Sequence, residues 1–240
     1  MRKLKNRTVT FISDCVLFVI LIGVSLVGFI PDSISATSLN QANSAIYRGQ
    51  AENGGVSLMF NVYEGADTVR GILEVLDERE AKATFFMGGC FADDNQTLLN
   101  EILQHGHELA NHGYFHKDHK KLSYEQNYKE IAHTNRIISS LTGVSPTLFA
   151  PPSGSFGVAT LKASYELGLK VIMWSKDTID WRDSDKQLIF KRATKGVSAG
   201  ELILMHPKPH TLEVLPEILD YFIAQNLKTL TVTENITLKG

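Results

Sequence analysis

Cysteine is nearly absent from this chain, which has only Cys15 and Cys90 in 240 residues. Two cysteines, one of them inside an apolar N-terminal segment, exclude a disulfide framework as the source of stability. A hydrophobic core must therefore stabilise the fold, and a content of 43% hydrophobic residues is sufficient to form one. The length leaves room for one large domain with a leader, but not for two full-sized domains.

Blocks of lysine and arginine are also absent, and the formal net charge is only -2. A protein that binds the phosphates of a nucleic acid normally carries a basic patch. We therefore expect no nucleic-acid partner. The chain contains no internal repeat and no low-complexity segment. We expect one globular domain that acts as a monomer.

The first thirty residues have the composition of a membrane-targeting segment. Residues 1–7 carry four basic side chains and no acidic one, and an apolar run follows over about residues 16–30. Basic residues tend to stay on the cytoplasmic side, so the rest of the chain is expected outside. Residues 1–30 form either a retained signal-anchor or a signal peptide, because small residues suitable for cleavage follow. We favour retention, which predicts a cell-membrane protein with an extracytoplasmic domain; cleavage predicts a secreted protein.

Residues 31–53 are rich in Ser, Asn, Ala and Gln, so we predict a linker that leads into a folded domain over residues 54–240. Within this domain, short apolar runs alternate with amphipathic segments. This alternation predicts an α/β fold with a mostly parallel sheet, and in one domain of this length it indicates a (β/α) barrel. Strands are expected over 57–62, 83–89, 107–111, 147–152, 170–175 and 201–206, and helices over 69–80, 97–106, 124–141, 159–168, 186–196 and 212–226.

Five of the eight histidines lie between residues 105 and 119, where chance clustering is a poor explanation. His112 and His116 follow a predicted strand, and active sites of such barrels lie at the C-terminal ends of strands. Their i, i+4 spacing places two imidazoles at metal-binding separation on a helical turn or in a tight loop. We predict that this pair binds a divalent metal, with Glu64 or Asp67 as the oxygen ligand. The other histidines of the cluster are interpreted as ordinary polar residues.

A second group of polar residues follows two later strands. Asp180 and Trp181 come after one predicted strand, and His206 ends another. A carboxylate can orient and charge an imidazole, and an aromatic face can pack against a sugar ring. We therefore predict that Asp180 orients a catalytic His206 and that Trp181 binds substrate. Asp183 or Asp185 is expected to cap the following helix.

Four ordered motifs, from about Val56 to the C-terminus, resemble those of the polysaccharide deacetylases of carbohydrate esterase family 4. No single motif is specific, but their order and spacing together are. The matches are His112 and His116 for the family's paired histidines, residues 149–154 for its Arg-Pro-Pro-Tyr motif, Asp180 and Trp181 for its Asp-Trp pair, and His206 for its Leu-x-His motif.

The resemblance implies a distorted (β/α) barrel of the polysaccharide deacetylase type. Such proteins remove acetyl groups from N-acetylated sugar units of a cell-wall polysaccharide, in peptidoglycan or chitin. The resemblance also implies a divalent metal, zinc or cobalt, on the two histidines. His206 would be the general acid that protonates the leaving amine, and Asp180 would tune it. Trp181 and Pro151 would contact the sugar.

The family's first motif is altered in this chain. Family members have Thr-Phe-Asp-Asp-Gly, with a general base followed by a metal ligand, where residues 59–65 read Met-Phe-Asn-Val-Tyr-Glu-Gly. Asn61 therefore stands at the catalytic base position, and its amide cannot accept a proton from water at ordinary pH. Val62 cannot bind a metal. Two extra residues would place Glu64 at the ligand position.

Ala150 stands where the family has an Arg that holds the base. The two changes are physically compatible, because an Arg beside a neutral Asn61 would leave a partly buried cation unpaired. Our leading hypothesis is metal-dependent deacetylation of a cell-wall glycan. Either Glu64 or Asp177 replaces the missing base, or the enzyme is slow and relies on the metal without a base. The alternative from another class is a catalytically weak or silent glycan-binding homologue. A metal-dependent amidase that acts on a small N-acyl substrate is a third hypothesis.

Overall fold

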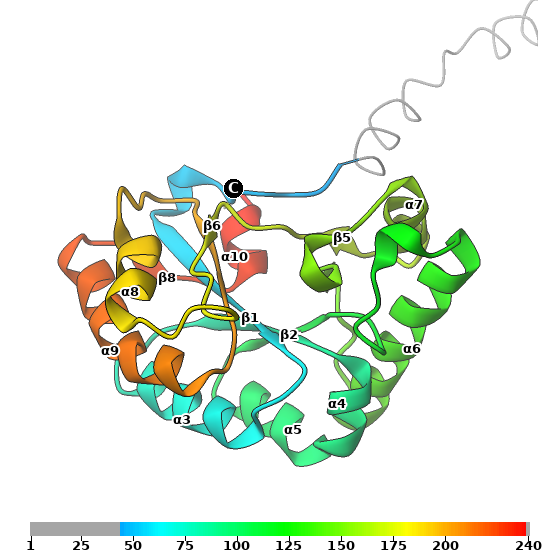
Figure 1. Cartoon of the computed structure of the whole chain (residues 1–240), viewed down its shortest axis with the longest axis horizontal. Helices are drawn as coiled ribbons and strands as arrows, with labels where there is room; N and C mark the ends of the chain where they lie inside the picture. The colour runs from blue at the N-terminus through cyan, green and yellow to red at the C-terminus, as the bar shows by residue number, and fades with distance from the viewer. Residues whose placement is uncertain (1–43, 239–240) are drawn as a thin grey trace, which may run out of the picture. The chain divides into compact units, whose positions relative to one another are not determined.

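The computed structural model describes residues 44–238 (Figure 1). The predicted membrane segment over residues 1–30 and the first part of the predicted linker lie outside the described residues. Among the described residues, none of the helices has the length and apolar character needed to span a membrane.

A parallel sheet forms the centre of the domain (Figure 1). Its long strand β1 (Gly55–Val62) lies between β2 (Ala83–Met87) and β7 (Leu202–Met205). The other strands are β3 (Glu108–Asn111), β4 (Leu148–Phe149), β5 (Lys170–Val171), β6 (Lys176–Asp177) and β8 (Lys228–Thr229). Their order is β5-β4-β3-β2-β1-β7-β6, and β8 also pairs with β1. Because β5 and β6 are the two ends of this order, the predicted α/β barrel is found as a distorted, open half-barrel.

Helices cover the outer face of this sheet (Figure 1). Six of them fall where the apolar periodicity predicts helices: α3 (Ala66–Asp77), α5 (Gln96–Gln104), α6 (Tyr124–Thr142), α7 (Val158–Glu166), α8 (Lys186–Thr194) and α9 (Pro209–Ala224). The sequence does not predict the short elements η1 (Ala51–Asn53), α4 (Gly89–Asp94), η2 (His119–Lys121), η3 (Pro152–Gly154) and α10 (Val232–Ile236), which are too short for a periodic signal.

The longest helix, α6, shows how local sequence sets the ends of these elements. Ser123 accepts a hydrogen bond from the Gln126 backbone N–H, and the Gln126 side chain accepts one from the Ser123 N–H, which forms a capping box. At the other end, Gly143 has a φ of 75°, a conformation that glycine adopts without a Cβ penalty. The helix therefore begins and ends at residues whose chemistry favours those positions.

Alternation along β1 decides which side chains reach the site. Leu58, Phe60 and Val62 belong to the core between the sheet and the helices, whereas Met59 belongs to a separate core on the other face. Successive side chains of a strand point to opposite faces, so Asn61 shares the face of Met59. The side chain of Val62 consequently packs in the outer core, on the face opposite to that of Asn61.

Residues 44–53 belong to the folded domain, which corrects the predicted boundary after residue 53. The Ile46 N–H donates to the Val171 carbonyl, and the Met173 N–H donates to the Ile46 carbonyl, so this segment pairs with the chain that follows β5. Arg48 also pairs with Glu201 at 2.9 Å. Because the polar composition of residues 31–53 contains no periodic signal and these contacts are with residues distant in the sequence, composition alone predicts a linker.

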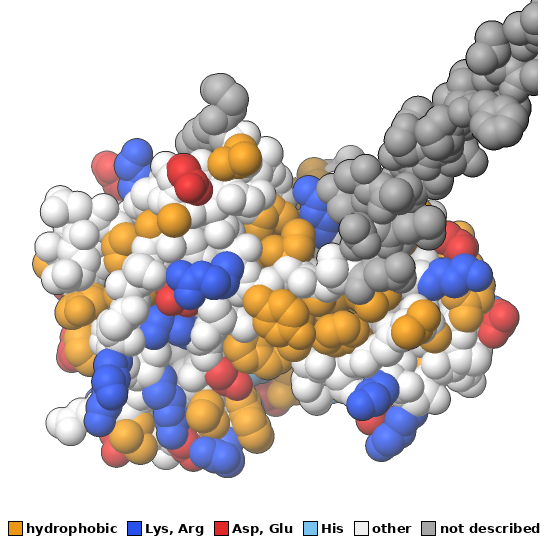
Figure 2. Space-filling model, turned by 90° about the horizontal axis from the view of Figure 1, so that it is seen from above, with side chains coloured by type: hydrophobic (Ala, Val, Ile, Leu, Met, Phe, Trp, Pro, Cys, Tyr) orange, Lys and Arg blue, Asp and Glu red, His pale blue; other side chains and the backbone are white. Residues whose placement is uncertain are grey.

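On the face seen in Figure 2, basic and acidic side chains are interspersed. Hydrophobic side chains gather near the centre of this face. This face therefore carries no extended area of one charge.

Candidate functional site

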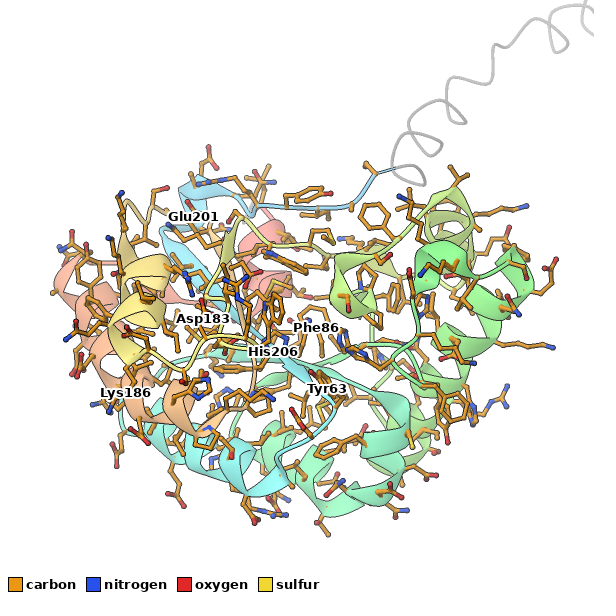
Figure 3. All side chains as sticks on the ribbon, viewed as in Figure 1. Tyr63, Phe86, Asp183, Lys186, Glu201 and His206 are labelled. Atoms are coloured by element: carbon orange, nitrogen blue, oxygen red, sulfur yellow. The ribbon has the colours of Figure 1, made fainter. Side chains whose placement is uncertain are left out.

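A pocket of about 230 Å³ lies at the C-terminal ends of β1, β3, β6 and β7. In Figure 3, His206 and Tyr63 lie near one another close to the centre of the domain. The sequence predicts site roles for five of the lining residues, Asn61, His112, His116, Trp181 and His206, and names Asp177 as an alternative base. It does not predict the other four, Tyr63, Ser153, Trp174 and Leu204.

Asp180 holds His206 in one orientation. One carboxylate oxygen, Oδ1, accepts from His206 Nδ1 at 2.8 Å. The other, Oδ2, accepts from the His206 backbone N–H and from the Thr211 hydroxyl, both at 2.7 Å. Because a carboxylate only accepts, Nδ1 carries the proton, and in the neutral ring the lone pair lies on Nε2. The structure thus brings together the two residues that the sequence expects to act as a pair.

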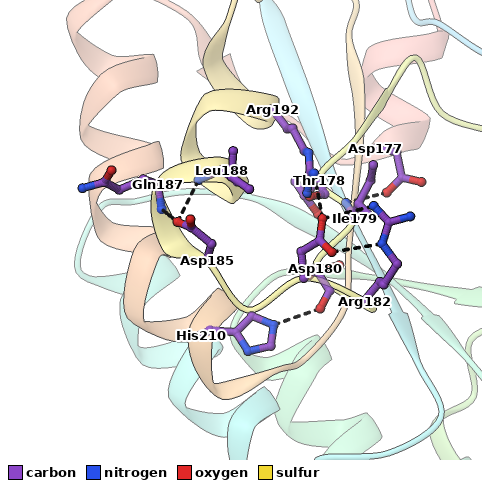
Figure 4. A network of polar contacts seen from close by, with 11 residues as sticks. Asp177, Thr178, Ile179, Asp180, Arg182, Asp185, Gln187, Leu188, Arg192 and His210 are labelled. Atoms are coloured by element: carbon purple, nitrogen blue, oxygen red, sulfur yellow. Dashed lines mark hydrogen bonds and ion pairs between the residues drawn. The ribbon is translucent and has the colours of Figure 1, made fainter.

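The loop between β6 and α8 is tied to α8 (Figure 4). Arg192 donates to the Thr178 carbonyl at 3.0 Å and to Asp183 at 2.7 Å. Arg182 and Arg192 lower the pKa of Asp183 to about 2. Asp185 accepts from two backbone N–H groups in the first turn of α8. Of the two predicted caps, Asp185 is therefore the helix cap, and Asp183 fastens the loop.

This loop presents Trp181 at the edge of the pocket. Its side chain is 51% exposed, and the Arg182 guanidinium lies 5.6 Å from the ring centre. Nearby, Ile179 has a φ of 57°, which a β-branched residue rarely adopts. The Ile179 N–H donates to Asp177 Oδ1 at 2.8 Å, which helps to hold this conformation. Backbone strain of this kind clusters at binding and catalytic sites.

His112 and His116 meet across a tight loop after β3, rather than on a helical turn. Gly113, with a φ of 73°, begins this loop, and His116 itself has a φ of 52°. The ring centres of the two histidines are 5.1 Å apart. His112 is fully buried, and its Nδ1 donates to the Ala150 carbonyl at 2.8 Å, which leaves Nε2 buried without a hydrogen-bond partner. Burial and the neighbouring His116 lower the pKa of His112 well below its usual range, so the ring is neutral at pH 7.

Tyr63 packs against these histidines. Its ring centre lies 4.3 Å from that of His116 and 6.4 Å from those of His112 and His206. Burial raises the pKa of Tyr63, so its hydroxyl keeps its proton at neutral pH. The one available sequence signal for Tyr63 was its place directly after a strand, where barrel side chains face the site.

The residues around the two histidines do not fit the three-ligand metal centre that the resemblance implies. Glu64, the predicted oxygen ligand, forms an ion pair with Lys208 and is not among the residues that line the pocket. The alternative, Asp67, is fully exposed and pairs with Arg70 at 3.2 Å. Between residues 44 and 238, no group of three or more His, Cys, Asp and Glu side chains is arranged to hold a metal ion. The pair of imidazoles therefore lacks an oxygen ligand.

Three positions that the sequence singles out have no charge to offer the pocket. The Asn61 side chain lines the pocket, and its buried Oδ1 has no hydrogen-bond partner. Ala150 is buried, and its methyl group cannot replace the charged side chain of the family's arginine. Pro151, the other predicted sugar contact, is buried and is not among the lining residues, whereas Ser153 is a lining residue.

The other histidines of the cluster lie outside the pocket lining. His105 pairs with Asp77 at 2.5 Å, and His119 bonds to the Asn127 amide oxygen at 2.7 Å. His107 is buried with no partner for either ring nitrogen, and burial lowers its pKa to about 4. The ion pair accounts for His105, whereas Nε2 of the buried His119 and both ring nitrogens of His107 have no partner among the described residues.

Comparison with known proteins gives consistent matches. The family model described as polysaccharide deacetylase matches residues 48–172. An uncharacterized protein, YlxY, from Bacillus subtilis (strain 168) is 34% identical over 189 residues, which cover 79% of this chain and 59% of that protein. The peptidoglycan-N-acetylglucosamine deacetylase PgdA from Listeria monocytogenes (strain 10403S) is 28% identical over 178 residues, 74% of this chain and 36% of that protein. The chain thus spans between about one third and three fifths of these two relatives.

A solved structure resembles the domain closely. BA3943 from Bacillus anthracis, described as a CE4 family pseudoenzyme, has a TM-score of 0.78 and 33% identity, and the match covers 81% of this chain and 69% of that one. A BA3943 mutant described as having restored enzymatic activity has the same TM-score at 31% identity and covers 81% of this chain and 71% of that one. With the matched family region and the open half-barrel, these findings make this chain a member of the polysaccharide deacetylase family.

Proposed function

We propose that this chain is a glycan-binding member of the polysaccharide deacetylase family that does not hydrolyse acetamides at a useful rate. The observation that carries this proposal is the end of β1. There, Asn61 and Tyr63 face the pocket where a deacetylase needs a base and an oxygen ligand. The sequence favours the active enzyme over the silent homologue, whereas the arrangement at the end of β1 supports the silent homologue.

Loss of the base is a large effect on its own. Proton transfer by a positioned base contributes about 10²–10⁴-fold to a rate. Glu64 is held by Lys208 and is not among the lining residues. Asp177 does line the pocket, but its Oδ1 already accepts the Ile179 N–H. Neither substitute base is therefore arranged as a dedicated proton acceptor.

The features that remain support binding. The pocket keeps an exposed aromatic ring, Trp181, at its edge and polar groups inside, which is how proteins commonly hold sugars. PgdA is named as a deacetylase of peptidoglycan N-acetylglucosamine, and BA3943 as a pseudoenzyme of the same family. These relatives support a cell-wall glycan as the ligand of this chain.

Slow, metal-dependent deacetylation is the second candidate function, because one part of the machinery is intact. Asp180 and His206 keep the contacts expected of a general acid and the carboxylate that orients it. In a protein without catalytic activity, this pair would only stabilise the fold. Acetate release separates the two candidates.

Replacing Trp181 with Ala should weaken binding to cell-wall glycan by about tenfold, because an exposed aromatic anchor carries a large share of such binding. The measurement is co-sedimentation of the full chain with insoluble, N-acetylated peptidoglycan, with acetate assayed in the same supernatants. Tyr47→Ala is the matched control, since Tyr47 is 49% exposed and lies outside the pocket lining. Equal loss in both variants, or no glycan binding by the unmodified chain, would contradict a glycan site in this pocket. Acetate release above the blank would favour the second candidate.

We also propose that the domain lies outside the cytoplasm, anchored at the cell membrane. The basic residues over 1–7 and the apolar run after them support this location. A reporter enzyme that works only outside the cytoplasm should be active when it is fused after Gly240. A reporter that works only inside the cytoplasm should be inactive in the same fusion. A reporter that is active only in the cytoplasm would reject both the anchored and the secreted forms.

A further inference from the structure

The pocket is lined by two side chains whose buried acceptor atoms have no hydrogen-bond partner among the residues that the structure describes. Asn61 is 2% exposed, and its Oδ1 has no hydrogen-bond partner. His112 is fully buried, and its Nε2 is also unpartnered. Because His112 Nδ1 donates to the Ala150 carbonyl, Nε2 of the neutral ring carries a lone pair. Both side chains line the pocket. A buried acceptor without a hydrogen bond is unfavourable, so a ligand that donates hydrogen bonds to these two atoms would be stabilised.

The charges around the pocket favour a cation. Asp177 is the charged residue among the lining side chains, which include no Lys or Arg. Two basic side chains that adjoin lining residues in the structure or the sequence are paired with acids, Lys208 with Glu64 and Arg182 with Asp183. In the family, a metal and an arginine supply positive charge to this region; here the arginine position is Ala150 and the metal ligands are incomplete.

We propose that the pocket binds the free ammonium group of a deacetylated amino-sugar unit in preference to an N-acetylated one. This inference rests on the proposed glycan-binding function and names the unit that is selected. A protonated amine offers three N–H donors and a positive charge, which match Asn61 Oδ1, His112 Nε2 and the Asp177 carboxylate. An acetamide is neutral and offers a single N–H donor. The sugar ring would pack against Trp181, whose side chain stands exposed at the edge.

The test compares two oligosaccharides of equal length, one of glucosamine and one of N-acetylglucosamine. Calorimetric titration of each into the full chain is done with a chelator present and at a mildly acidic pH, where the glucosamine amine is protonated. We expect the glucosamine oligomer to bind about tenfold more tightly, the size of effect expected for one charge-assisted hydrogen bond.

Asp177→Asn should remove most of this preference. The Asn side chain keeps an oxygen that accepts the Ile179 N–H, so the loop is preserved while the charge is lost. Asp185→Asn is the matched control, because it changes net charge equally, lies outside the pocket lining and leaves an Asn that still caps a helix well. The preference should survive in this control.

The outcomes separate this inference from the proposed function. If the unmodified chain binds both oligomers and shows no preference for glucosamine, the ammonium site is wrong while glycan binding stands. If the two Asp→Asn variants lose the preference equally, the effect is one of net charge and the ammonium site is again wrong. If neither oligomer binds, the proposed function fails and the ammonium site fails with it.

Discussion

Changing Asn61 to Asp, Tyr63 to Asp and Ala150 to Arg together should raise acetate release by at least about 10²-fold over the unmodified chain in the presence of zinc or cobalt. Asp at position 61 supplies the missing base, and Arg at position 150 keeps it ionised and oriented. Asp at position 63 supplies an oxygen ligand where the tyrosine ring now lies against His116.

Position 63, which neither alignment of the first motif assigns to the ligand, is chosen because the Tyr63 ring lies against His116. An ungapped alignment to Thr-Phe-Asp-Asp-Gly places the ligand at Val62. In the structure, however, Val62 packs in the core between the sheet and the helices, so a carboxylate there would be buried among apolar side chains. The control is therefore the same triple change with Val62→Asp in place of Tyr63→Asp. We expect this control to bind no metal and to be less stable.

A BA3943 mutant described as having restored enzymatic activity supports the idea that this fold can regain catalysis.

The single change Asn61→Asp should raise acetate release little in this chain. Nothing would hold the new carboxylate, and the oxygen ligand of the metal would still be missing. Greater activity in the Val62 control than in the Tyr63 variant would show that we have misplaced the ligand. No gain in either variant, with both folded, would mean that more than these three positions prevents catalysis.

Asp180→Ala should lower the free energy of unfolding by about 3 kcal/mol, the upper end of the cost of leaving buried hydrogen-bond donors without their acceptor. Asp180 is 1% exposed and accepts three hydrogen bonds, two from His206 and one from Thr211. Truncation leaves those donors buried without an acceptor. The measurement is denaturant unfolding at neutral pH, followed by circular dichroism.

The control for this prediction is Asp185→Ala, which removes a helix cap at the surface of the same loop region. Loss of such a cap costs about 1 kcal/mol. If Asp180→Ala costs no more than Asp185→Ala, the Asp180–His206 pair does not stabilise the fold, and its retention would instead favour a catalytic role for His206.

Much of this fold follows from local patterns. The run over residues 57–62 predicts β1 because it is apolar, bounded by glycine and of strand length, and the 3.6-residue periodicity predicts α3, α5 and α9. The same patterns place His112, Asp180 and His206 after strands, where the structure brings them to one pocket or beside it. Local chemistry also predicts Asp185 as a cap.

Other features depend on contacts that a local pattern does not contain. Position 63 lies one residue beyond β1, so strand alternation does not say whether its ring turns toward His116 or toward solvent. The ion pair of Glu64 with Lys208 joins residues far apart in the sequence, so no local pattern predicts it. Trp174 and Ser153 reach the pocket from loops after strands of only two residues, whose ends the sequence does not define.

Titration of zinc into the metal-free full chain tests the central claim most directly, namely that the family's metal centre has been replaced by a pocket packed with Tyr63. We predict no tight one-to-one zinc complex, because no carboxylate within residues 44–238 joins His112 and His116 in a group that could hold a metal ion. The Tyr63→Asp triple variant should form one in the same experiment. A tight one-to-one complex in the unmodified chain that disappears on His112→Ala would contradict the claim and restore metal-dependent deacetylation as the leading function.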